Sequence, residues 1–453
     1  MAVTAPAAAA AVPAAGPGDR PGDGGPGPEA AAVEGPLPGS PPGDPDSPDI
    51  EDTYPWLATH VDLAAAGYVE EEFIVEGEAD AYSLTGERLA TDVPYRTRIL
   101  VRRPTNPHRF NGAVLAEWQN VSAGFDIDAL WAYRHILRAG YAWVGISAQR
   151  VGVDHLKSWS PARYGDLDVT GGGRFTADEL SYDIFAQAAA ALRASARRGE
   201  ARPLGRLRAD TLLAIGGSQS AGRMTVYYDQ VLPQVEPVFD GYGFIVGSAP
   251  SRDGDEPVFH LLSETDVRSP NRRPDSDRYR RWEVAGAAHS GWNGQEYRRP
   301  LLERDLGAAP EYECDQPPFS RVPLHQVLGA AFDHLVRWVE RGTPPPTAPP
   351  LELAPDGSKV RDELGLARGG IRLSQVEVPI ALNTGDNAGE TFCGLFGTHV
   401  PFDEELLDEL YPSRGRYVAA VARVDHRNVR AGYITAADAR DNRREALESG
   451  VGR

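Results

Sequence analysis

The stretch TLLAIGGSQSAGR, residues 211–223, joins a run of apolar residues to a group of glycine, serine and alanine. The apolar run is typical of a buried strand, and a helix is expected from Gln219 or Ser220 to Tyr228. Small residues are needed where a strand turns sharply into a helix, because the backbone is strained and passes close to its neighbours. A serine at the tip of such a turn is exposed as a nucleophile. The stretch therefore predicts a strand, a strained turn that carries Ser218, and a helix.

Two serines compete for the nucleophile position. Ser218 has Gly216 two places before it, but Ser220 stands two places after it, where glycine is usual. If Ser220 were the nucleophile, Gly222 would occupy that later place and Ser218 the earlier one. We favour Ser218 because the predicted strand ends directly before Gly216. A plain glycine–serine turn is one rival interpretation, and a phosphate-binding loop that lacks its usual lysine is another.

Strand-like and helix-like segments alternate on both sides of this turn. Two partly alternating segments come first, as expected of half-buried antiparallel strands, and short apolar runs typical of buried parallel strands follow. This order predicts an α/β fold with a mostly parallel sheet of about eight strands and helices on both faces, the arrangement of an α/β-hydrolase core. The predicted strands are 73–79, 95–101, 113–118, 141–147, 211–215, 243–246, 258–262 and 282–285, and the predicted helices are 129–138, 176–192, 219–228 and 324–339.

A carboxylate and a histidine follow two of the later strands. Glu264 and Asp266 come just after one predicted strand, and His289 stands in a loop of small residues after the last one. In this fold the chain order is serine, acid, histidine, at the carboxyl edge of the sheet. We therefore predict a catalytic triad of Ser218, Asp266 and His289, with Glu264 as the rival acid. His289 would take the serine proton, and Asp266 would fix the tautomer of the imidazole.

An oxyanion that forms on the substrate would need backbone N–H donors. We expect one from Gln219, directly after the nucleophile, and another from the loop of residues 119–122 that follows the third predicted strand. Within that loop, Asn120 is the predicted donor. The sequence holds no HExxH or comparable metal-binding spacing, so we expect neither a metal ion nor a cofactor.

These motifs resemble those of the "alpha/beta hydrolase domain" proteins, a bacterial family within the α/β-hydrolase superfamily. The resemblance covers the chain from about Ile50 to the C-terminus. It implies a serine-dependent hydrolase that acts on carboxylic esters. The motifs that carry it are EWQNV (117–121), GGSQSAGR (216–223), SETDV (263–267), WEVAGAAH (282–289) and GGIRL (369–373).

Composition argues against several other classes of protein. The chain has 453 residues and a net charge of −19, and such a negative surface repels the phosphates of nucleic acids. No apolar run approaches the roughly 18 residues that a membrane span requires. We therefore expect a small-molecule ester as the partner, with no nucleic acid and no membrane. Because no convincing signal peptide is present, the predicted location is the cytoplasm, with secretion left open.

The chain divides into three predicted regions. Residues 1–48 are rich in proline, alanine and glycine and predict a disordered tail. Residues 49–349 form the predicted hydrolase core. Beyond residue 350 the strand–helix alternation is lost, which predicts a C-terminal region packed on the core that could form part of a lid. The two cysteines, Cys314 and Cys393, could form one bridge or remain separate thiols, and the sequence leaves both alternatives open.

Together these features predict a metal-independent serine hydrolase that cleaves a carboxylic ester through an acyl-enzyme intermediate. A lactonase, a thioesterase or an acyltransferase would use the same triad. A catalytically silent member that binds a small ligand is the alternative from another class of protein.

Overall fold

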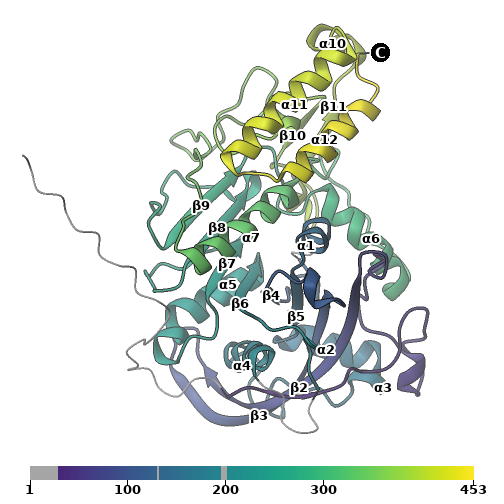
Figure 1. Cartoon of the computed structure of the whole chain (residues 1–453), viewed down its shortest axis with the longest axis vertical. Coiled ribbons are helices and arrows are strands. Elements are labelled where there is room, and N and C mark those ends of the chain that lie inside the picture. The colour runs from purple at the N-terminus through teal and green to yellow at the C-terminus, as the bar shows by residue number, and fades with distance from the viewer. Residues whose placement is uncertain (1–28, 130–131, 195–200, 453) are drawn as a thin grey trace, which may run out of the picture.

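The computed structural model describes residues 29–129, 132–194 and 201–452. Within these residues a nine-stranded sheet runs through the molecule in the order β1-β2-β3-β5-β4-β6-β7-β8-β9 (Figure 1). The strands from β5 to β9 are parallel to their neighbours, whereas β1, β2 and β3 pair antiparallel and β3 is antiparallel to β5. The predicted mostly parallel α/β-hydrolase fold is confirmed. The strands are β1 (Ala32–Glu34), β2 (Tyr68–Tyr82), β3 (Arg88–Pro104), β4 (Ala113–Trp118), β5 (Ala142–Ile146), β6 (Thr211–Gly217), β7 (Gly241–Ile245), β8 (Val258–Ser263) and β9 (Tyr279–Val284).

The strand β1 is an addition to the predicted sheet, and it falls within the predicted disordered tail. It pairs antiparallel with β2, so that Val33 lies opposite Val75, and Val33 is buried. The prediction of a disordered tail therefore fails for residues 32–34, because the open edge of β2 supplies backbone partners that composition could not reveal. Residues 1–28 of the predicted tail lie outside the described residues.

Helices surround the sheet and continue into the C-terminal region (Figure 1). The helices that frame the site or pack on it are α1 (Tyr133–Ala139), α4 (Ser181–Arg193), α5 (Gln219–Val226), α6 (Trp292–Leu306), α7 (Leu324–Arg341), α9 (Cys393–Phe396), α11 (Arg414–Ala431) and α12 (Ala436–Glu448).

Helices cover both faces of the sheet at its centre. Gly216 on β6 faces α5, since a Cβ atom there would lie 3.2 Å from the Cα atom of Ala221. Gly243 on β7 faces α7, since a Cβ atom there would lie 3.9 Å from Leu335. Gly216 pairs with Phe244, the neighbour of Gly243, and successive residues of a strand face opposite sides. The helices α5 and α7 therefore lie on opposite faces, with the carboxyl end of β6 between them.

The region after residue 350 packs on the core through its last helices, which Figure 1 shows beside α7 and α1. Gln326 of α7 and Asn442 of α12 exchange two amide hydrogen bonds of 2.7 and 3.2 Å. Arg138 of α1 donates a hydrogen bond of 2.6 Å to Asp438 of α12. The boundaries at residues 49 and 350 stay predictions.

The two cysteines are joined by a disulfide whose partners are 79 residues apart in the sequence. The structure thus decides between the two alternatives that the sequence left open. A membrane span needs a helix that is both long and strongly apolar, and the helices of residues 29–129, 132–194 and 201–452 include none.

Candidate active site

The turn between β6 and α5 holds Ser218 in a strained conformation. Its φ of 58° and ψ of −117° lie outside the regions that side-chain-bearing residues ordinarily adopt. The backbone N–H of Ser218 donates a hydrogen bond of 2.9 Å to the carbonyl oxygen of Ile245, which ties the turn to β7. Gly247 also approaches the turn, since a Cβ atom there would lie 2.8 Å from the carbonyl oxygen of Ser218. Strain of this kind is typical of a nucleophile turn in which close neighbours determine the backbone.

Ser220, the rival nucleophile, points into the protein. Its hydroxyl donates a hydrogen bond of 2.8 Å to the carbonyl oxygen of Gly217 and accepts one of 3.0 Å from the N–H of the same residue. The side chain is fully buried. These bonds explain why a serine can stand where glycine is usual, since its hydroxyl satisfies backbone groups of the turn.

The structure brings Asp266 and His289 together. Nδ1 of His289 lies 2.7 Å from Oδ1 of Asp266, and the other carboxylate oxygen accepts a hydrogen bond of 2.5 Å from Ser263. The backbone N–H of His289 donates to the hydroxyl of Thr265 at 3.1 Å, which fixes the loop on which the histidine stands. An Asp266 carboxylate in this position selects the tautomer with hydrogen on Nδ1 and leaves Nε2 free to accept a proton.

The carboxylate of Glu264, the rival acid, binds other groups than His289. Its carboxylate accepts hydrogen bonds from the backbone N–H groups of Gly286 at 2.6 Å and Gly385 at 3.1 Å. It also pairs with Arg361 at 2.9 Å. The side chain is fully buried, and these three partners join β8 and the loop after β9 to the C-terminal region. Glu264 therefore holds segments together, and none of the hydrogen bonds of its carboxylate among the described residues goes to His289.

Ser218 and His289 both line a cavity of about 710 Å³. That volume is typical of a pocket for a small molecule. The hydrogen bonds of the described residues include none between the Ser218 hydroxyl and His289, and such bonds commonly tighten only when substrate is bound. The polar part of the lining includes Asn120, Ser218, His289, Ser290, Arg298 and His325.

The prediction for the oxyanion loop needs a correction at Asn120. Its backbone N–H donates a hydrogen bond of 3.3 Å to the carbonyl oxygen of Ile127, so that this N–H is not available to a substrate. The Asn120 side chain instead donates to the carbonyl oxygen of Gly217 at 2.9 Å and thereby supports the turn. The next N–H, that of Val121, lies 3.5 Å from the side-chain oxygen of Gln219, which is a weak contact. Gln219 itself begins α5, where a backbone N–H has no acceptor within the helix.

Two polar side chains of the cavity were not predicted from the sequence. Arg298 of α6 donates a hydrogen bond of 2.8 Å to the hydroxyl of Ser290, the residue after His289. His325 of α7 has a buried Nδ1 atom without a hydrogen-bond partner among the described residues. Burial lowers the pKa of His325 to about 4, so that its ring is neutral near pH 7. A sequence signal for either residue is lacking, because neither stands in a motif or at a strand end.

The disulfide connects two segments of the cavity wall. Tyr312 and Phe396 both line the cavity, and their rings meet at 4.5 Å between centroids. Tyr312 lies two residues before Cys314, and Phe396 lies three residues after Cys393. The bridge therefore fastens the short helix α9 of the C-terminal region against the segment that follows α6.

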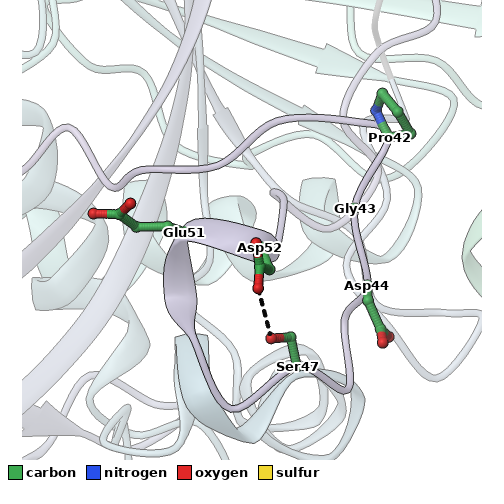
Figure 2. Close-up of a pocket in the computed structure, with 6 residues that line it drawn as sticks. All are labelled: Pro42, Gly43, Asp44, Ser47, Glu51 and Asp52. Atoms are coloured by element: carbon green, nitrogen blue, oxygen red, sulfur yellow. Dashed lines mark hydrogen bonds between the residues drawn. The ribbon is translucent and has the colours of Figure 1, made fainter.

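A second hollow, of about 470 Å³, lies at the N-terminal side of the described chain (Figure 2). It is acidic, and neither Ser218 nor His289 lines it, so the larger cavity is the candidate active site. In the part of the chain that the structure describes, no group of three or more histidine, cysteine, aspartate or glutamate side chains could hold a metal ion. The lining of the second hollow is Pro42, Gly43, Asp44, Ser47, Glu51 and Asp52.

A protein-family model described as "Alpha/beta hydrolase domain" matches residues 33–444. A search of curated proteins found no match. Solved structures with a similar fold include acetyl xylan esterase 1 from Thermoanaerobacterium sp., with 14% identity over 40% of this chain and 49% of that one and a TM-score of 0.24.

Two further solved structures come from Xanthomonas species. The rice cell wall degrading esterase LipA of Xanthomonas oryzae shares 15% identity over 40% of this chain and 43% of that one, with a TM-score of 0.22. A serine hydrolase without a lid from Xanthomonas campestris shares 16% identity over 51% of this chain and 97% of that one, with a TM-score of 0.29. The chain spans less than two thirds of the length of both esterases, with matches over 49% and 43% of them.

Proposed function

Because the chain belongs to the alpha/beta hydrolase domain family, we propose that it is a serine hydrolase that cleaves carboxylic esters through an acyl-enzyme on Ser218. One observation carries the proposal: the strained Ser218 at the end of β6 shares a cavity with His289, and Asp266 holds that histidine at 2.7 Å. A serine, a base and an acid in these positions are the parts that acyl transfer needs.

In the first half-reaction, Nε2 of His289 accepts the hydroxyl proton of Ser218 while the serine oxygen bonds to the ester carbonyl carbon. The carbonyl electron pair moves to its oxygen. When that pair returns, the bond to the alcohol breaks and His289 gives its proton to the leaving oxygen. Asp266 stays ionised and stabilises the imidazolium that forms between these steps.

In the second half-reaction, water takes the place of the alcohol. His289 accepts a proton from the water, whose oxygen bonds to the acyl carbon, and the proton then returns to the oxygen of Ser218. A carboxylic acid leaves and the free serine is restored. An alcohol in place of water would give acyl transfer by the same route.

The oxyanion of both steps requires donors that point into the cavity. The N–H of Gln219 is one donor, since it starts α5 directly after the nucleophile. The N–H of Val121 is the second, since Asn120 gives its own N–H to Ile127 and the contact of Val121 with Gln219 is easily exchanged. The Asn120 side chain supports this arrangement by holding Gly217.

Fluorophosphonate labelling tests the nucleophile. We expect an adduct on the peptide that contains Ser218, located by mass spectrometry, and hydrolysis of short p-nitrophenyl esters that falls about 10⁴-fold or more in Ser218→Ala. Ser220→Ala is the matched control. It should remain labelled and active and lose only about 1 kcal/mol of stability, because its hydroxyl bonds to the backbone alone.

Two results would contradict the proposal. Activity that survives in Ser218→Ala but disappears in Ser220→Ala would move the nucleophile to Ser220. A folded protein that takes no label and hydrolyses none of the esters would be a silent ligand-binding member of the family.

The disulfide bears on where the enzyme works. Cytosolic reductants keep most cysteine pairs reduced, so the Cys314–Cys393 bridge favours an oxidising compartment over the cytoplasmic location expected from the sequence. Thiol titration of the denatured, unreduced protein checks the bridge, and two reactive thiols would remove this argument.

A further inference from the structure

We propose that Arg298 selects the substrate by binding a carboxylate, so that the natural substrate is an ester carrying a second, anionic group. This inference rests on the proposed esterase function and deepens it. Its starting point is the place of Arg298 on α6, in the wall of the cavity that Ser218 and His289 also line.

Arg298 has no acidic partner of its own. Its one hydrogen bond within the described residues goes to the neutral hydroxyl of Ser290, at 2.8 Å. The ion pairs of those residues include no carboxylate for it. The acidic residues that line the same cavity are Asp128, Glu296 and Glu311, and no ion pair of the described residues joins any of them to Arg298. Asp128 is bound to Arg102 at 2.7 Å and accepts a hydrogen bond from Tyr297 at 3.2 Å. The positive charge of Arg298 is therefore left for a ligand.

The surroundings of Arg298 make that charge costly. Burial lowers the pKa of its guanidinium, and Asp128 and Tyr312 offset this only in part. Arg298 is only partly buried, but a charge without an ionic partner in such a place is still unfavourable, and an anion that enters the cavity would offset this cost. The cavity is thus prepared for a carboxylate, although the chain as a whole carries a net charge of −19 and repels anions.

Ser290 completes a site for a planar carboxylate. Its hydroxyl oxygen already accepts hydrogen bonds from Arg298 and, at 2.9 Å, from Gln295. The hydroxyl hydrogen is therefore free to donate to a ligand. A guanidinium and a hydroxyl side by side can bind both oxygens of one carboxylate, and Ser290 directly follows His289 in the chain. The bound anion would then lie near the reacting ester.

The test compares pairs of esters of which one member carries a carboxylate and the other does not. One arm uses 4-nitrophenyl hydrogen adipate against 4-nitrophenyl hexanoate, which places the carboxylate on the acyl side. The other uses 4-butyryloxybenzoate against phenyl butyrate, which places it on the alcohol side. We expect the wild type to prefer the anionic ester in one arm, and Arg298→Met to reduce kcat/KM for that ester about 10- to 100-fold while the neutral ester changes little.

Two further variants sharpen the test. Arg298→Lys keeps the charge without the planar fork and should retain part of the preference. Arg299→Met is the matched control, since Arg299 lies next to Arg298 on α6 but is exposed and pairs with Glu303 at 2.9 Å. It should leave the preference unchanged.

Binding gives a readout that does not depend on turnover. Adipate should bind to Ser218→Ala in isothermal titration calorimetry and should not bind to the variant that also carries Arg298→Met. Equal losses for charged and neutral esters in Arg298→Met would mean that Arg298 only supports the His289 loop, and would overturn the inference. So would a wild type without anionic preference in either arm. If no ester is cleaved and no label is taken up, the proposed function fails, and the adipate titration still decides whether Arg298 binds anions.

Discussion

Two regions inside this protein contain charged side chains. They differ in whether other residues of the chain supply the ionic and hydrogen-bond partners of those side chains. Around Glu72 on β2, both carboxylate oxygens are occupied: Arg98 and Tyr164 donate at 2.8 Å to one, and Arg163 donates at 2.6 Å to the other. In the candidate cavity, Ser218 and Arg298 have no carboxylate partner among the described residues, and His289 keeps one ring nitrogen free beside its bond to Asp266. The chain thus supplies the partners of the Glu72 carboxylate, although one Nη2 atom each of Arg98 and Arg163 lacks a hydrogen-bond partner among the described residues, whereas the cavity is open to a ligand.

The pKa values of the arginines reflect the same difference. Burial alone would lower the pKa of Arg98, but Tyr164 and Glu72 raise it above its ordinary value. At Arg298 the effect of burial prevails and the pKa falls. A buried charge whose partners come from the chain stabilises the fold, whereas the partly buried Arg298 has no carboxylate partner among the described residues and is available to a ligand. Three predictions test this distinction.

The largest effect is expected at the two acids after β8. Asp266→Asn should lower kcat about 10⁴-fold, because an amide at that place favours the wrong tautomer of His289. Ester hydrolysis by the purified variant measures the loss. Glu264→Gln is the control, since Glu264 bonds to Gly286, Gly385 and Arg361 and not to the histidine. It should reduce stability more than kcat. Similar, mild losses of kcat in both variants would mean that neither carboxylate is the partner of His289.

The next effect concerns stability alone. Burial by itself would raise the pKa of Glu72, but Arg163 and Arg98 lower it below its ordinary value, so the side chain is charged in the folded protein. Glu72→Gln leaves Arg163 without its carboxylate and Arg98 with only Asp126, at 3.7 Å, and we expect a loss of about 3–5 kcal/mol of unfolding free energy in urea titrations.

The neighbouring residue on β2 provides the control for Glu72. Glu71 pairs with Arg103, but this pair is partly exposed. Glu71→Gln should therefore cost only about 0–1 kcal/mol. If Glu72→Gln cost no more stability than Glu71→Gln, the ion pairs and hydrogen bonds of Glu72 would contribute little to the stability of the fold.

How far the sequence predicts this site depends on how local each signal is. Ser218, Asp266 and His289 could be predicted because each follows a strand, and strand ends meet at one edge of a parallel sheet. Asn120 shows the limit of that rule: its bond with Ile127 joins two loop residues, which no periodicity reveals. Arg298 could not be predicted at all, because α6 contains Gly294 and Pro300 and lacks a helical apolar pattern.

The C-terminal region shows the same dependence on pattern. Helices α10 (Glu404–Leu410) and α12 lie beyond residue 350, where the strand–helix alternation of the sequence is lost. The helix α11 between them was not predicted, although it provides half of the buried apolar residues of a second, smaller core. Its many arginines dilute the apolar stripe, so that only the packed structure shows which face is buried.

The smallest expected effect is at Asp425 of α11, which tests the distinction outside the cavity. Asp425 is 1% exposed, and neither of its carboxylate oxygens has a hydrogen-bond partner among the described residues. Burial raises its pKa from 3.8 to about 6; Ser374 and Asn442 oppose this rise, and Glu445 and Asp438 add to it. The ion pairs of the described residues include no cation for Asp425, so its charge should destabilise the protein. Asp425→Asn should therefore raise stability near pH 8 by about 1–3 kcal/mol.

The pH dependence gives this prediction its sign. Between about pH 4 and about pH 6 the folded chain keeps a proton on Asp425 that the unfolded chain has lost, so the stability contributed by this group falls as pH rises. The advantage of Asp425→Asn should accordingly grow over that range and vanish near pH 4. Urea titrations across the range measure it, with Asp408→Asn on the exposed side of α10 as the control that should stay near zero. A variant less stable than the wild type at pH 8 would show that neighbouring groups stabilise the Asp425 carboxylate. A charged side chain without an ionic partner would then no longer distinguish the cavity from the rest of the protein interior.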